Sequence, residues 1–427
     1  MRTRPRRDAA ASDARSGDGA APVPAPGEAA LREVVEALAP IERRPCSPGE
    51  REAAERLAGR LRRAGCDVAL EEEAARGLYM PTLAGLGVAA TAGAALCLAG
   101  RRAAGTLASL AAAAALVDEA QNGPRLLRRA LYRPRTTVNV VGRPAAAAGS
   151  PDRPADDASL PTLVVLAHHD AHQVGRLYDQ SALRTVHRLA PDLLARLRTA
   201  PPQWWAGLAG PVLAVAGAVT GGRRPAIAAL ALNVAGTAAV AEVARNPVSP
   251  GANDNLSGVA ALVGLAELLR ERPIPGVRVL LVSCGAEEAL QEGIRPFVAR
   301  HSPELDRERT RFLNLETVGS PRLVMLEGEG PIWMEDYARP GFRDLVSWTA
   351  RRASIALERG FRARASTDSA IPSRAGYPTA TLTSLTDWGA LANYHLATDV
   401  PENVDYGTVA DAARLAYGVA AALADEG

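Results

Sequence analysis

The chain has 427 residues, which is enough for one large domain or two smaller ones, and its formal net charge at pH 7 is only +2. This charge balance, without a basic stripe interleaved with aromatic residues, argues against a nucleic-acid partner. All 49 basic residues are arginine, which together with the abundant alanine indicates a GC-rich genome rather than a function.

The four cysteines are not arranged as metal or redox motifs. None lies in a CxxC pair, so zinc-finger and thioredoxin-like sites have no support. Only Cys46 and Cys66 are candidates to pair, and nothing requires them to, which favours a reducing compartment. Residues 1–30 are rich in Arg, Ala, Pro, Gly and Asp and lack the apolar core of a signal peptide, so we expect a disordered tail.

Helices and strands are expected to alternate along the chain. Helical periodicity begins at residue 31, and Ser47, Pro48 and Glu50 form the capping signature of a helix that ends near Gly65. Strands are expected over 67–71, 136–141, 162–167, 277–283, 311–316, 322–327 and 378–383. Helices are expected after Asn253 and over 291–301, 341–358 and 405–424. This order predicts an α/β fold whose mixed, mostly parallel sheet is flanked by helices.

Two apolar stretches, residues 79–118 and 204–244, interrupt this pattern. Each is a pair of apolar segments divided by a double arginine, Arg101-Arg102 in the first and Arg223-Arg224 in the second. Segments of about 20 apolar residues are long enough to cross a bilayer. We therefore expect two inserted helical hairpins in contact with membrane lipid; the alternative is Ala-rich helices buried within or against a soluble domain.

Two hairpins make an even number of crossings, so the remaining segments stay on one side of the membrane. The hairpin tips carry only the two arginine pairs, whereas many arginines flank the crossings on the other side. This bias favours a multi-pass membrane protein whose α/β part is cytoplasmic.

Histidine and acidic residues follow several of the expected strands. His168 follows the strand expected over 162–167. Asp170 is placed to accept a hydrogen bond from one ring nitrogen of His168, which leaves the other ring nitrogen free to bind a metal. His169 and His172 remain competitors for the role of ligand. Because open α/β sheets bind ligands at the carboxyl ends of their strands, we expect these groups to meet at one edge.

Four further patches supply the rest of a metal site. Asp254, in a small-residue turn that opens a helix, is a candidate to bridge two cations through both carboxylate oxygens. In the adjacent pair after the next strand, we interpret Glu288 as a ligand and Glu287 as a general base, although acidic residues are also common at solvated helix starts. Glu316 and His395 are the last two candidate ligands, at a strand end and in a loop.

Taken in order, these patches resemble the M28 family of co-catalytic zinc peptidases. The motifs stand as His168-His169-Asp170, Gly251-Ala252-Asn253-Asp254-Asn255, Glu287-Glu288, Asn314-Leu315-Glu316 and Tyr394-His395. The resemblance covers about 31–75, 136–175 and 248–427, so that residues 31–427 are expected to form one such domain interrupted by the two hairpins.

The resemblance implies a phosphorylase/hydrolase-like fold, two zinc ions, and release of N-terminal residues or related amide hydrolysis. One ion would bind His168, Asp254 and Glu316, and the other Glu288 and His395, with Asp254 shared. The family often has a cis peptide bond before the bridging aspartate, which here would be Asn253-Asp254. Tyr394 is a candidate oxyanion donor.

The chain departs from the family pattern at three places. Glu316 stands where aspartate is commoner, and the gap between Asp170 and Asp254 holds the second hairpin. Thr367-Asp368-Ser369 stands where Ser-Asp-His is frequent, so Asp368 is a candidate substrate contact only.

The sequence therefore predicts a membrane-associated zinc aminopeptidase that acts on peptides or aminoacyl amides, with Glu287 moving the proton. Two alternatives remain. One is an acyltransferase similar to glutaminyl cyclases, with one zinc ion. The other is an inactive membrane scaffold with no zinc.

Overall fold

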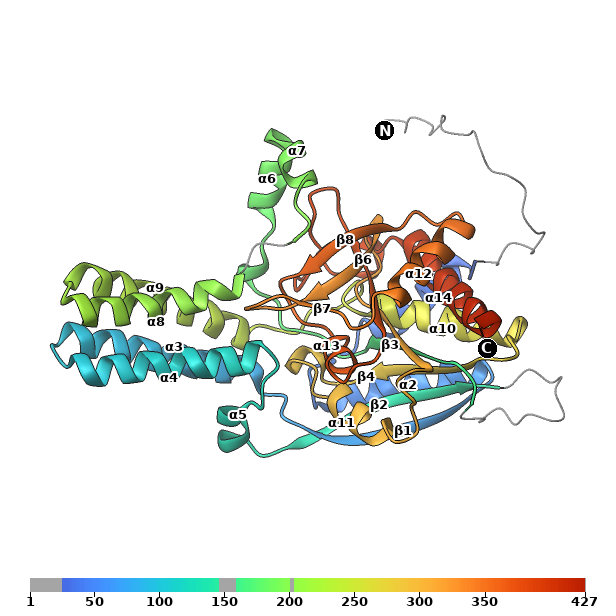
Figure 1. The fold of residues 1–427 in the computed structure, drawn as a ribbon, viewed down its shortest axis with the longest axis horizontal. Coiled ribbons are helices and arrows are strands. Elements are labelled where there is room, and N and C mark those ends of the chain that lie inside the picture. The colour runs from blue at the N-terminus through green and yellow to red at the C-terminus, as the bar shows by residue number, and fades with distance from the viewer. Residues whose placement is uncertain (1–24, 146–158, 200–202, 427) are drawn as a thin grey trace.

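The computed structural model describes residues 25–145, 159–199 and 203–426. A nine-stranded mixed sheet forms the centre, and its main path runs in the order β1-β2-β4-β3-β5-β9-β6-β7, with β8 paired to β6 (Figure 1). The strands are β1 Cys66–Ala75, β2 Arg135–Pro144, β3 Thr162–His168, β4 Arg278–Cys284, β5 Thr310–Leu315, β6 Arg322–Glu329, β7 Glu335–Asp336, β8 Glu358–Ala363 and β9 Thr379–Leu385. The central strands β4, β3, β5 and β9 are parallel to one another.

Both faces of this sheet are covered, as the apolar runs of its central strands require. In β3, Leu163 and Val165 belong to the larger core, whereas Val164 and Leu166 point into the smaller one. The larger core is closed by α1 Glu28–Leu38, α2 Pro48–Arg63, α10 Leu256–Glu271, α12 Gly341–Arg352 and α14 Tyr406–Glu426. The smaller is closed by α11 Ile294–His301 and α13 Ala370–Arg374. The predicted α/β class is confirmed.

Four apolar helices leave this domain together as two hairpins (Figure 1). They are α3 Tyr79–Leu98, α4 Arg102–Ala120, α8 Gln203–Thr220 and α9 Arg223–Arg245. Helix α3 packs against α4 and α9, and α8 packs against the same two helices, so the hairpins form a four-helix bundle. Three of the helices, all but α8, are long and apolar enough to cross a membrane.

The bundle projects from the domain instead of being buried in it (Figure 1). Its exposed large hydrophobic residues include Val88, Leu107, Leu110, Val212, Val219, Ile227 and Val234. Exposed apolar surfaces of this kind mark interaction sites for other proteins or for membranes.

Three local expectations need correction. The tail expected through residue 30 is wrong at its end, because residues 28–30 form the first turn of α1, which buries Leu31 and Val35; residues 1–24 lie outside the described part. The helix expected over 341–358 ends at Arg352, where Ser354 adopts a positive φ of 53°, and β8 follows. Glu50 accepts the N–H of Cys46, not that of Ser47 as a capping box requires.

The remaining elements are short. They are the helices α5 Leu126–Leu131, α6 Ser181–Leu189 and α7 Pro191–Ala195 and three 3₁₀ turns, of which Glu287–Ala289 bears on the site. All four cysteines are free.

Candidate metal centre

The carboxyl ends of three parallel strands place the first group of side chains. His168 is the last residue of β3, and its register partner in β4 is Cys284, just before the turn that carries Glu287 and Glu288. Glu316 directly follows β5 on the other side of β3. Since parallel neighbours end at the same edge, residues far apart in the sequence meet there.

Asp254 reaches the same edge from the turn before α10. The helix packs closely on β5 because residue 258 is glycine: a Cβ atom there would lie 2.2 Å from the carbonyl oxygen of Leu315. The carboxylate of Asp399 accepts the backbone N–H groups of Asn253, at 2.7 Å, and Asp254, at 3.1 Å. The cis peptide bond lies between Asp254 and Asn255, one bond later than expected.

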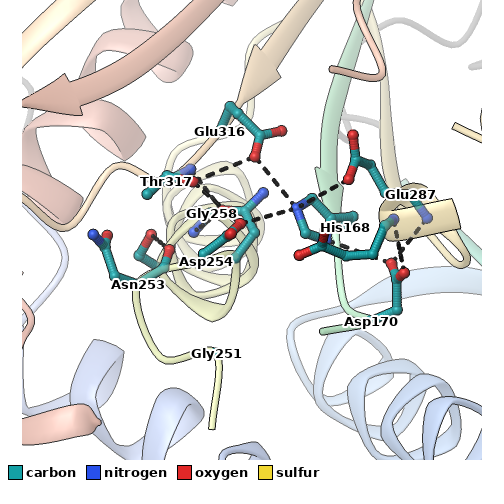
Figure 2. Close-up of polar contacts among 12 residues, drawn as sticks. His168, Asp170, Gly251, Asn253, Asp254, Gly258, Glu287, Glu316 and Thr317 are labelled. Carbon is teal, nitrogen blue, oxygen red and sulfur yellow. Dashed lines mark hydrogen bonds and ion pairs between the residues drawn. The ribbon is translucent and has the colours of Figure 1, made fainter. Parts of the chain in front are cut away.

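The carboxylate of Asp254 lies between two imidazoles. Its Oδ1 atom is 3.4 Å from Nε2 of His168, and its Oδ2 atom is 3.0 Å from Nε2 of His395. Around this pair, Glu316 Oε1 lies 3.3 Å from His168 Nε2, and Glu288 Oε1 lies 3.2 Å from His395 Nε2. The five predicted ligands therefore form one continuous, buried cluster, the His168 half of which is drawn in Figure 2.

Glu287 stands beside the His168 half of the cluster (Figure 2), and its carboxylate also forms a third compact group of possible ligand atoms with His168 and Glu288. Its Oε2 atom is 3.8 Å from Nε2 of His168, and its Oε1 atom accepts a 2.7 Å hydrogen bond from Gln291. Asp170 accepts the backbone N–H groups of Glu287 and Glu288, both at 3.0 Å, and faces Nδ1 of His168 at 3.4 Å.

Aromatic rings hold His395 in place. His172 stacks on one face at 4.0 Å with an interplanar angle of 4°, and Tyr394 stacks at 3.7 Å. Tyr178 meets the ring edge-on at 4.5 Å. His172 also brings a ring nitrogen close to the ligand atoms of Glu288 and His395, so it is a further candidate ligand of the second position.

Several polar atoms of the cluster lack a hydrogen-bond partner among the described residues, although they are buried. They include Nδ1 and Nε2 of His395, Oδ2 of Asp254 and Oε1 of Glu288. Burying a polar atom without a hydrogen-bond partner costs free energy. Imidazole nitrogens and carboxylate oxygens are also the atoms that bind cations such as Zn²⁺. His168, Asp254 and Glu316 form one compact group of possible ligand atoms, and His172, Glu288 and His395 form another. The residues present thus fit a bound metal ion.

The charges of the cluster shift one another's pKa values. Burial alone would lower the pKa of His168, but the carboxylates of Glu316 and Glu287 hold it well above its usual value. Burial raises the pKa of Glu288 to about 7 and raises that of Glu287 well above its usual range. The two imidazoles keep the pKa of Asp254 low, against the effect of burial.

The other candidates lie in different positions. His169 points away from the cluster, with Nδ1 2.9 Å from Ser283 Oγ, and burial lowers its pKa to about 4. Asp368 is fully buried near the cluster, and neither of its oxygens has a hydrogen-bond partner in the described part of the chain. Tyr394 is placed beside His395 at the cluster.

Sequence reasoning missed three residues that position the site. Gln291 holds one oxygen of Glu287, and Asp399 holds the turn of Asp254. The fully buried guanidinium of Arg43 donates to the carbonyls of His169, at 2.9 Å, and Pro250, at 2.7 Å, which ties two site loops together. No local motif marks these three residues as part of the site. The one feature of the sequence that could have indicated such a role is the position of Asp399 just after the Tyr394-His395 loop.

Comparisons with known proteins agree with this geometry. Residues 237–420 match the sequence model described as Peptidase family M28; this range contains Asp254, Glu287, Glu288, Glu316 and His395 but not His168 and Asp170, which precede the second hairpin. No curated protein matches the chain closely enough in sequence to count as a relative.

Solved structures share the fold. One is a leucine aminopeptidase precursor from Bacteroides thetaiotaomicron, with TM-score 0.51, 16% identity, and coverage of 93% of this chain and 98% of that one. Another is an aminopeptidase from Aneurinibacillus sp. strain AM-1, with TM-score 0.52, 14% identity, and coverage of 92% and 93%. A third is a glutaminyl cyclase from Bacteroides thetaiotaomicron, with TM-score 0.51, 14% identity, and coverage of 93% and 99%.

Proposed function

We propose that the protein is a membrane-associated zinc exopeptidase of the aminopeptidase type, because residues 237–420 match the sequence model of peptidase family M28. It cleaves the amide bond after an N-terminal residue in peptides or aminoacyl amides. The observation that carries the proposal is the position of Asp254, whose two oxygens face His168 and His395 at 3.4 Å and 3.0 Å. A carboxylate so placed can bridge two ions.

The ligand sets follow from these contacts. His168 and Glu316 would hold one zinc ion and Glu288 and His395 the other, with Asp254 shared. When bound, the ions supply Lewis acidity, which polarises a carbonyl and makes water more acidic.

Glu287 moves the proton. Gln291 holds its Oε1 atom, which leaves Oε2 to take a proton from water and return it to the departing amine. Asp170 fixes the turn that carries Glu287 through its bond to the backbone N–H. Tyr394, stacked on His395, is placed to contact the substrate carbonyl, and Asp368 is a second candidate contact.

The test is Glu287→Gln, with the exposed Glu304→Gln as its matched control. Glu287→Gln should keep its zinc and lose about 10²–10⁴-fold in kcat on leucinamide, because the amide cannot accept the proton. Glu304→Gln should match the wild type. Unchanged turnover in Glu287→Gln would refute the assignment.

Two other functions are separated by metal content. An acyltransferase similar to the glutaminyl cyclases, whose solved structures share this fold, would hold one zinc ion per chain, and a scaffold none. We expect two, because all five ligands meet in one cluster. Zinc analysis of the purified protein decides among the three functions. In the His395→Ala variant we expect the zinc content to fall from two ions per chain to one.

We also propose that the two hairpins cross the membrane. Both leave the domain side by side, so their tips lie together on the far side and the metal centre stays near the membrane surface (Figure 1). The arginine bias favours a cytoplasmic catalytic domain.

A further inference from the structure

A cavity of about 380 Å³ joins the metal centre to the interior of the four-helix bundle. At one end it is lined by Glu287, Glu288 and His395. At the other it is lined by all four apolar helices, including Leu86 of α3, Leu116 of α4 and Pro211 of α8. The site therefore opens not only to solvent-exposed surfaces but into the segment that we propose to lie in the membrane.

The cavity is elongated along the bundle. Its lining on α3 extends from Met80 to Ala90, a rise of about 15 Å along the helix. The lining residues of α4 and α8 also come from the halves of those helices nearest the domain, and those of α9 run from its middle, at Leu232, toward the domain. A linear group attached to a bound amide fits this shape better than a compact side chain does.

The chemistry of the wall points to an alkyl chain. Beyond Tyr79 and Trp204 at its mouth, the lining helices contribute only two polar side chains, Asn233 and Thr237. Thr237 already donates to the carbonyl of Asn233 at 2.6 Å. A peptide strand here would leave its own N–H and C=O groups unpaired, at several kcal/mol each, whereas an alkyl chain has none.

Asn233 is the other polar side chain of this wall. Its side chain is 7% exposed and lines the cavity, and its Nδ2 donor has no partner among the described residues. This single donor leaves the rest of the wall apolar, as an alkyl chain requires.

We infer that the preferred substrates carry a long apolar chain next to the scissile amide, and that this chain lies between the hairpins while the amide lies at Glu287. The inference rests on the proposed hydrolase function. It identifies the substrate class as lipid-like amides that reach the site from the membrane.

The first experiment compares substrates in protein reconstituted into lipid nanodiscs. Leucine dodecylamide carries the chain on the amine side, N-dodecanoyl-leucinamide carries it on the acyl side, and leucinamide carries none. We expect one dodecyl substrate to exceed leucinamide by at least about tenfold in kcat/KM, since even one methylene in an apolar pocket can be worth that factor. The dodecyl substrate with the higher kcat/KM shows whether the chain lies on the amine side or on the acyl side of the scissile amide.

A matched pair of glycine variants tests the cavity. Gly236 lines it, and a Cβ atom there meets nothing within 4 Å, so Gly236→Leu adds a side chain without a clash at its first atom. Gly85 in α3 is equally open but does not line the cavity. Gly236→Leu should reduce the dodecyl preference about tenfold or more, and Gly85→Leu should keep it. Gly207→Leu, which would push the flexible end of Leu116 into the cavity, is the second blocking variant.

A measurement without turnover separates this inference from the proposed function. A leucine alkylamide with a diazirine at the chain end is photolysed with the Glu287→Gln protein, and the labelled peptides are identified by mass spectrometry. Labels within 80–90 or 232–240 support the inference. Labels confined to the outer faces of the bundle, or equal rates for chain and no-chain substrates in an active enzyme, overturn it. Loss of all hydrolysis with correct labelling would overturn the proposed function alone.

Discussion

The carboxylate of Asp170 accepts the backbone N–H of Glu287 at 3.0 Å. One residue thereby controls two parts of the site, since it also faces Nδ1 of His168 at 3.4 Å. The position of Asp170 was expected from its spacing to His168. Its hold on the turn of Glu287 was not, because that contact joins residues separated by the whole second hairpin.

Asp170→Asn should therefore impair both metal binding and proton transfer. An asparagine must turn its NH₂ group toward one of two backbone donors, so either Glu287 or Glu288 loses its anchor. We expect zinc affinity and kcat each to fall about 10–100-fold. Zinc titration and leucinamide kinetics measure the two effects, and Asp192→Asn on exposed α7 is the control. Full zinc affinity in Asp170→Asn would contradict this role.

The sequence predicted the parts of the fold that local patterns encode. Apolar runs predicted the central strands, and two apolar pairs predicted the hairpins, because these signals need no tertiary partner. Contacts that depend on the tertiary structure were not predicted. Gln291 reaches the carboxylate of Glu287 only because the backbone turns tightly between them, with left-handed φ values of 67° at Leu290 and 59° at Gln291. Strand β8 was not predicted either, because its arginine-rich sequence lacks the alternation of apolar and polar residues that indicates a strand.

The sequence predicted five ligands in order, and the structure brings a further imidazole, that of His172, close to Glu288 and His395. His172 was kept only as a competitor of His168, because both lie within one short motif. In the structure the two histidines face different halves of the site, and His172 stacks on His395. Motif spacing alone does not separate two neighbouring imidazoles when the loop between them turns.

Glu329 should make stability depend on pH. It is buried at the end of β6 and accepts hydrogen bonds from Tyr337, at 2.7 Å, and from Thr367, and burial raises its pKa from 4.5 to about 7. The folded state thus keeps a proton that the unfolded chain releases. This contribution is fully present below pH 4.5 and is lost as the pH rises to about 7, at a cost of up to about 3 kcal/mol.

Glu329→Gln should reduce the dependence of folding stability on pH in this range. Thermal unfolding at about pH 5 and about pH 8 should show a smaller loss of Tm in the variant than in the wild type. The difference between the two proteins isolates Glu329 from other titrating groups. The exposed Glu304→Gln serves as control, and a slope unchanged in Glu329→Gln would show that the carboxyl is ionised throughout.

Cysteine labelling tests the proposed topology. In a Cys46→Ser background, Arg102→Cys and Arg223→Cys place a thiol at each hairpin tip, and Glu308→Cys places one on the exposed surface of the catalytic domain. A membrane-impermeant maleimide should label the two tips from the side opposite to that from which it labels residue 308. Labelling of all three positions from one side would show that the hairpins do not cross the bilayer.

Gly258 links the packing of the fold to the metal centre. In Gly258→Ala the new Cβ would lie 2.2 Å from the carbonyl oxygen of Leu315, a backbone atom that cannot move without its strand. Helix α10 must then shift from β5, which separates Asp254 from Glu316. We expect about 1–3 kcal/mol of lost stability and weaker zinc binding.

The matched control is Gly59→Ala in α2, where the added Cβ has an ordinary 3.7 Å contact and alanine favours the helix. Gly59→Ala should be neutral or stabilising, with unchanged zinc affinity. Thermal unfolding of the zinc-free proteins separates the packing cost from the metal. If zinc-free Gly258→Ala is as stable as the wild type, the contact with β5 is not what requires glycine there.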